Sequence, residues 1–124
     1  MTSIFLGTKY VRQEYFQALA SQIATGTLAA PHHLATMQRG AKIYNIKNTT
    51  DTVLRFFLIN PTDPAQTLLF WMELDPGENF GFDLAQTPQQ FDLPGQTKIY
   101  CAGVTLAGID ATPTLGRVRM LAWG

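Results

Sequence analysis

Short apolar runs separated by clusters of turn-forming residues make up most of the chain from residue 41 to residue 124. The clusters at 48–51, 60–64, 75–79 and 93–96 are rich in proline, glycine, asparagine and aspartate, which favour turns. The runs around them predict strands at 42–47, 53–59, 67–74, 80–84, 97–102, 104–107 and 117–123. Short strands with no helical pattern between them indicate an all-β fold, an antiparallel β-sandwich or jelly roll of about seven or eight strands.

Residues 1–40 have a different pattern. Val11, Tyr15, Leu19 and Ile23 recur every four residues, which is the spacing of an apolar stripe along a helix. This spacing predicts a helix at about 9–25, followed by an extended segment that lacks a sustained period. The predicted organisation is therefore an N-terminal helix-containing arm at 1–40 and a β-sandwich domain at 41–124.

Two of the predicted strands, 53–59 and 68–72, are apolar on nearly both faces. A two-layer sandwich has one interior, so a second dry face needs a cover, either residues 1–40 folded back over it or another subunit. For an inter-subunit core, the pattern favours Leu54, Phe56, Leu58, Leu69 and Trp71. For the contact made by the arm, it favours Val11, Tyr15, Leu19 and Ile23.

Composition narrows the classes of function. Nine basic and nine acidic side chains give zero net charge, which argues against electrostatic binding of nucleic acid. Charged residues make up 15% of the chain, below the roughly 25% of an average domain, and this suggests that part of the surface is covered. No apolar run approaches the roughly 18 residues of a membrane-spanning helix.

Candidate catalytic and metal-binding groups are few and scattered. His32 and His33 are adjacent, so on an extended segment they point in opposite directions and do not chelate one metal together. Cys101 lies inside a predicted strand with no histidine close in sequence, which is typical of a small core residue. The sequence therefore predicts no catalytic residues, no cofactor and no metal, and we expect a protein that is not an enzyme.

The order of motifs after residue 41 is similar to that of a known class of proteins. It runs through Ile46-Lys47-Asn48-Thr49-Thr50, the apolar strand 53–59, the turn Asp75-Pro76-Gly77-Glu78, the alternating strand 80–84, Phe91-Asp92-Leu93-Pro94-Gly95-Gln96, the strand 97–102, Asp110-Ala111-Thr112-Pro113 and the strand 117–123. Over about two-thirds of the chain, this order resembles the small β-sandwich virion proteins of tailed bacteriophages, including capsid decoration (cement) and accessory proteins.

The resemblance implies a structural role in the virion, which is assembled in the host cytoplasm. A protein of this class binds the head shell and stabilises it, commonly as a trimer, with the major capsid protein or other virion proteins as partners. The charge balance, the short apolar runs and the missing site motifs separately predict no nucleic acid, no membrane and no cofactor. The alternative is a carbohydrate- or ligand-binding β-sandwich module, for example in a tail or fibre, in which Trp71 or Trp123 supplies a sugar-stacking face.

Overall fold

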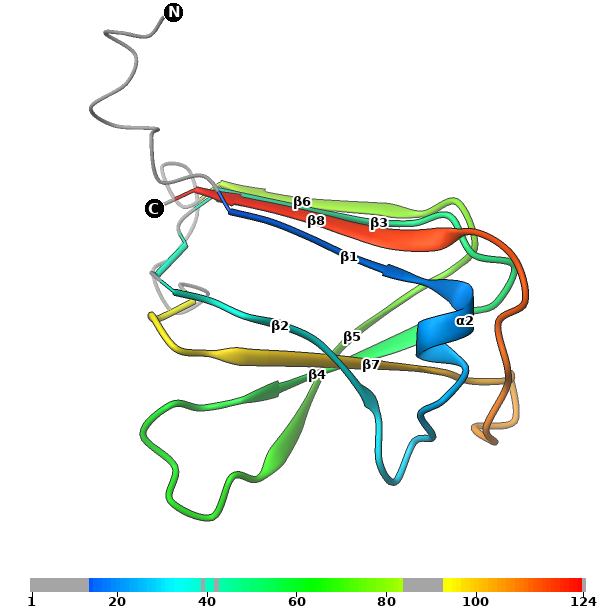
Figure 1. Cartoon of the computed structure of the whole chain (residues 1–124), viewed down its shortest axis with the longest axis horizontal. Coiled ribbons are helices and arrows are strands. Elements are labelled where there is room, and N and C mark those ends of the chain that lie inside the picture. Colours follow the sequence, from blue (N-terminus) through cyan, green and yellow to red (C-terminus); the bar gives the residue numbers. More distant parts are fainter. Residues whose placement is uncertain (1–13, 39, 42, 84–92, 124) are drawn as a thin grey trace, which may run out of the picture.

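The computed structural model describes residues 14–38, 40–41, 43–83 and 93–123, and over these it is a sandwich of two four-stranded antiparallel sheets. The strands are β1 (Glu14–Leu19), β2 (His32–Thr36), β3 (Ile43–Asn48), β4 (Leu54–Ile59), β5 (Leu68–Leu74), β6 (Asn79–Asp83), β7 (Lys98–Gly103) and β8 (Arg117–Trp123). Sheet A has the order β1-β8-β3-β6 and sheet B the order β2-β7-β4-β5. Figure 1 shows the two sheets as separate layers. The predicted antiparallel sandwich is confirmed.

The strand order is that of a jelly roll. β1 pairs with β8, β2 with β7, β3 with β6 and β4 with β5, as in one long hairpin folded at the turn between β4 and β5. Rolling this hairpin adds the pairs β3–β8 and β4–β7, which complete the two sheets. Eight strands in two Greek keys define the jelly-roll architecture.

The helix predicted at about 9–25 is wrong over most of the residues that the structure describes. Glu14–Leu19, expected within a helix, is strand β1, and the helix α2 is limited to Ala20–Ile23. A spacing of four residues also returns to the same face of a strand, whose side chains alternate with a period of two. Tyr15 and Leu19 do share a face, but it is the exposed face of β1, whereas Ala18 is buried.

The predicted arm is part of the sandwich. β1 is an edge strand of sheet A and β2 an edge strand of sheet B, so residues 14–38 do not form a separate unit. The part of the predicted helix at 9–13 lies outside the described residues. The strand predicted at 104–107 also does not form, because Val104 makes only an isolated bridge to Asp110 and the following residues turn.

The space between the sheets is filled by side chains from both. Tyr44, Ile46 and Met120 from sheet A and Phe56 and Ile99 from sheet B are almost fully buried. Ile23 of α2 is buried in the same core. Because apolar side chains alternate inward along each strand, this one core accounts for one face of each sheet and leaves the two outer faces free for other roles.

Candidate functional site

The outer face of sheet B carries a row of aromatic side chains that crosses all four strands. Cross-strand register aligns His33 with Tyr100, Tyr100 with Phe57 and Phe57 with Phe70, and we call these four residues the aromatic row. The rings of His33 and Tyr100 lie 5.0 Å apart between centroids. Phe70 is 62% exposed, although it lies in β5, the edge strand of sheet B that pairs with β4.

Polar pairs flank the aromatic row on both sides. On one side Arg55 Nε lies 2.6 Å from Glu73 Oε2, and the Arg55 guanidinium lies 5.7 Å from the centre of the Phe70 ring. On the other side Lys98 Nζ donates to Gln66 Oε1 at 3.2 Å. An apolar centre with a polar rim is the arrangement found at protein–protein interfaces.

A β-bulge in β5 decides which residues reach this outer face. Phe56 pairs with Met72 and Phe57 with Phe70, so Trp71 is an extra residue between two pairs. The Trp71 ring is directed inward, with its centroid 5.7 Å from that of Tyr44. The sugar-stacking face expected from Trp71 is therefore absent, and the side chain of Trp123 lies outside the described residues.

Only part of the predicted inter-subunit core reaches the surface. Leu54 and Phe56 are fully buried between the sheets, so assigning them to an interface is wrong. Leu58 and Trp71 are partly buried and pack against the same core. Leu69 is 52% exposed, on the opposite side of the β4–β5 hairpin from the aromatic row.

The residues predicted for the arm contact also lie in different environments, some buried and some exposed. Ile23 is buried in the core, which excludes it from a contact with a neighbour. Tyr15 is 52% exposed and Leu19 is 45% exposed, both on the outer face of sheet A. Val11 lies outside the described residues.

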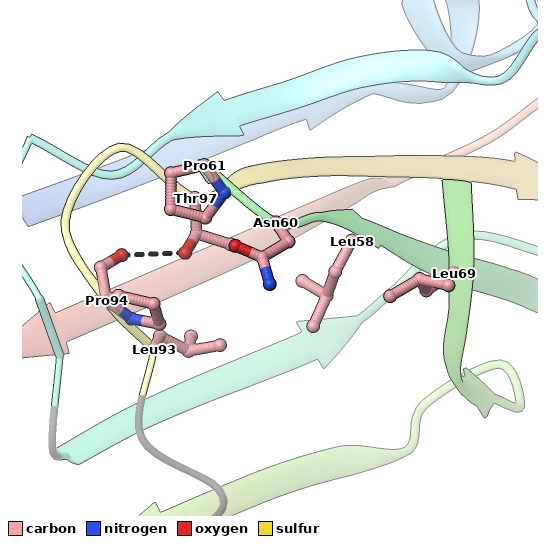
Figure 2. Close-up of a pocket in the computed structure, with 7 residues that line it drawn as sticks. All are labelled: Leu58, Asn60, Pro61, Leu69, Leu93, Pro94 and Thr97. Carbon is pink, nitrogen blue, oxygen red and sulfur yellow. Dashed lines mark hydrogen bonds between the residues drawn. The ribbon is translucent and has the colours of Figure 1, made fainter. Parts of the chain in front are cut away.

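A pocket of about 150 Å³ opens where the β4–β5 hairpin leaves the sandwich (Figure 2). Leu58 and Leu69 form its apolar side, facing Leu93 and Pro94. The Thr97 hydroxyl donates a hydrogen bond to Pro94 O at 2.7 Å. The pocket is therefore suited to binding an apolar group, and none of the residues that line it is charged.

A second, polar depression of about 180 Å³ lies on the outer face of sheet A. Its lining is Tyr15, Asn45, Lys47, Arg119 and Leu121, and we call it the basic groove. All five residues point away from the core, since the residues that alternate with them, such as Tyr44, Ile46 and Met120, are buried.

Burial shifts the pKa of two groups that could carry catalytic chemistry, Cys101 and His32. Cys101 is fully buried, and this burial raises the pKa of its thiol to about 12, so it is a core residue as its position in the sequence suggested. Partial burial lowers the pKa of His32, and the neighbouring His33 lowers it further. Within the described residues, no three His, Cys, Asp or Glu side chains cluster as metal ligands. In the same residues, no helix is long and apolar enough to cross a membrane.

Comparison of the chain with protein-family models, curated proteins and solved structures finds no match.

Proposed function

We propose that this chain is a structural subunit of a bacteriophage virion, a capsid decoration protein that binds the head shell and its own copies through the outer face of sheet B. The aromatic row is the observation that supports this proposal. Exposed, contiguous apolar surface on a small protein marks an interaction site, and here it lies on paired strands and not on a loop.

The energy available from this face is modest for each copy. Full burial of a phenylalanine is favourable by about 1.5–3 kcal/mol, so the 62% exposed surface of Phe70 offers roughly 1–2 kcal/mol per copy. Phe57 and Tyr100 extend the same surface. In a shell, many copies repeat the contact, and multivalency turns modest contacts into strong attachment.

The fold is compatible with this role without specifying it. Jelly rolls occur in viral capsid domains, lectins and cupins, so function has to be argued from the surface. The described part of residues 1–40 supplies β1, α2 and β2 and leaves Phe70 exposed, which favours cover by another subunit over cover in cis.

Analytical ultracentrifugation of the full chain tests the assembly surface. We expect self-association, with a trimer at three times the 13.7 kDa of one chain. Phe70→Ser is expected to weaken it about tenfold for each interface in which Phe70 is buried. Leu106→Ser is the matched control, because Leu106 is fully exposed in the loop between β7 and β8. A monomeric wild-type chain, or equal weakening by both variants, would refute self-association through sheet B.

Quantitative mass spectrometry of the tailed-phage particles that encode this chain tests the virion role. Hundreds of copies per particle support a decoration protein of the shell. About a dozen copies would contradict shell decoration and place the chain at a neck, vertex or tail. Absence from the particles would overturn the virion assignment altogether.

A further inference from the structure

The basic groove on sheet A is built from two neighbouring cross-strand rows. One row places Tyr15, Leu121 and Asn45 side by side on β1, β8 and β3 and ends at Gly81 on β6. The next row places Arg119 directly opposite Lys47. Because Gly81 has no side chain, the groove stays open beyond Asn45, where a Cβ would come within 3.2 Å of the amide nitrogen.

The placement of the two cations is unfavourable for the isolated chain. Like charges directly opposite each other in a sheet are destabilising, and Lys47 and Arg119 occupy such a pair. The structure gives neither of them an ion pair with a described residue, whereas Arg55 on the other sheet is paired with Glu73. Arg117 lies two residues from Arg119 on the same face and adds a third positive charge. An anion bound between Lys47 and Arg119 would relieve this repulsion.

We propose that the basic groove binds an acidic saccharide, a sugar bearing a carboxylate. A guanidinium donates two parallel hydrogen bonds to a carboxylate, which assigns the acid group to Arg119 with Lys47 beside it. The side-chain amide of Asn45 offers both a donor and an acceptor to sugar hydroxyls. The half-exposed ring of Tyr15 supplies an apolar face for the sugar ring.

Hydrogen bonds to neighbouring side chains restrain the position of the Tyr15 ring. Its hydroxyl donates to Gln17 Oε1 at 2.9 Å, and Gln17 Oε1 also accepts from Arg117 at 3.5 Å. These bonds tie the aromatic wall of the groove to the cationic face beside it. A bare inorganic anion would use the two cations and leave Tyr15 and Asn45 without a role.

The position of the groove argues against an acidic peptide. An extended peptide commonly binds by adding a strand at a free sheet edge. The groove is centred on β8 and β3, which are inner strands of sheet A and are paired on both sides. Since the aromatic row lies on sheet B, the saccharide site is independent of the proposed assembly surface, and both can be occupied at once.

Isothermal titration of the full chain with tetragalacturonate tests the proposal, with its methyl ester as the uncharged ligand of the same backbone. We expect the wild type to bind the acid at least about tenfold more tightly than the ester, because the ester lacks the charge-assisted bonds. Arg119→Gln and Tyr15→Ala are each expected to weaken binding about tenfold or more. Lys98→Gln, which removes one positive charge from sheet B, is expected to leave binding unchanged.

Folding is checked separately by thermal unfolding at low salt. Arg119→Gln removes one of two opposed cations, so we expect its midpoint to equal or exceed that of the wild type. The proposal is overturned if wild type does not bind tetragalacturonate, if the folded Arg119→Gln variant binds it as well as wild type, or if Lys98→Gln weakens binding equally. Equal affinity for tetraglutamate or for inorganic phosphate would also overturn it, because neither ligand is a sugar.

Discussion

Asn48 holds together one end of the sandwich, and its removal gives the sharpest prediction for the fold. The side chain is fully buried at the end of β3. Its amide nitrogen donates to Thr52 O at 3.0 Å and to Leu74 O at 2.9 Å. Its amide oxygen accepts from Thr50 N at 2.9 Å and from Thr50 Oγ1 at 2.6 Å. One asparagine thereby connects the ends of β3 and β5 with the loop that leads into β4.

Asn48→Ala removes all four of these hydrogen bonds from a buried position. At about 0.5–1.5 kcal/mol for each bond, the sum is roughly 2–6 kcal/mol. The single hydroxyl hydrogen of Thr50, released from Asn48, then turns to Thr52 O, which lies 2.9 Å from Thr50 Oγ1, so the loss lies below the top of this range. We expect Asn48→Ala to lower the free energy of unfolding by about 3–5 kcal/mol, a large share of the stability of a typical domain.

Urea denaturation followed by tryptophan fluorescence measures this loss. The matched control is Asn60→Ala, since Asn60 is exposed and its side-chain oxygen also accepts two bonds, from Thr62 N at 2.9 Å and from Thr62 Oγ1 at 2.8 Å. Water replaces those bonds, so we expect the control to lose less than about 1 kcal/mol. If the two variants differ by less than about 1 kcal/mol, the reasoning from burial is refuted.

Two further predictions concern the loop that precedes β8. The hydroxyl and backbone N–H of Thr114 donate hydrogen bonds to Asp51 and lower the pKa of its carboxyl group to about 2. The charged carboxylate therefore stabilises the fold at neutral pH, and this contribution is lost as the pH falls from about 4 to about 2. Asp51→Asn should therefore lower the thermal midpoint at pH 7 and converge with wild type near pH 2; a difference that does not change with pH would contradict this. Gly116 has φ +86°, and a Cβ there would overlap Thr49 O, whereas Gly77 has φ +85° with nothing near a Cβ. In urea denaturation, Gly77→Ala should cost about 1–2 kcal/mol and Gly116→Ala at least about 3 kcal/mol, and equal losses would show that the overlap is relieved at no cost.

The strands after residue 41 could be predicted because turn chemistry marks their ends. Predicted bounds at 117–123 match those of β8, and the bounds of β4 and β5 are met within one residue. β1 could not be recognised, because a four-residue repeat satisfies both a helix and a strand. Only the pairing of β1 with β8, a contact between the two ends of the chain, distinguishes the two, and no local pattern contains it.

The sequence pattern predicts which two strands carry the apolar outer surface, but it does not predict which of their residues face outward. The apolar pattern on both sides of these two strands correctly indicated apolar side chains on the outer face of β4 and β5. Strict alternation places Leu54 and Phe56 on one side and Phe57 on the other, and nothing local shows which side is inside. The bulge at Trp71 then shifts the alternation in β5, so that Phe70 and not Trp71 faces outward.

The contrast between the two outer faces is not required by folding. Both sheets derive from one rolled hairpin, and the core takes only the inward residues of each. Folding therefore does not require the side chains of Phe70 and Arg119, and other residues compatible with a strand could replace them. An exposed phenylalanine on one sheet and two directly opposed cations on the other sheet both have a cost for an isolated chain. Under the two proposals made above, each face has its own partner and these costs are offset when the partners bind. On this reasoning Phe70→Ser changes the free energy of unfolding of the monomer by less than about 1 kcal/mol while it weakens self-association, and a larger loss of monomer stability would show that Phe70 serves the fold instead.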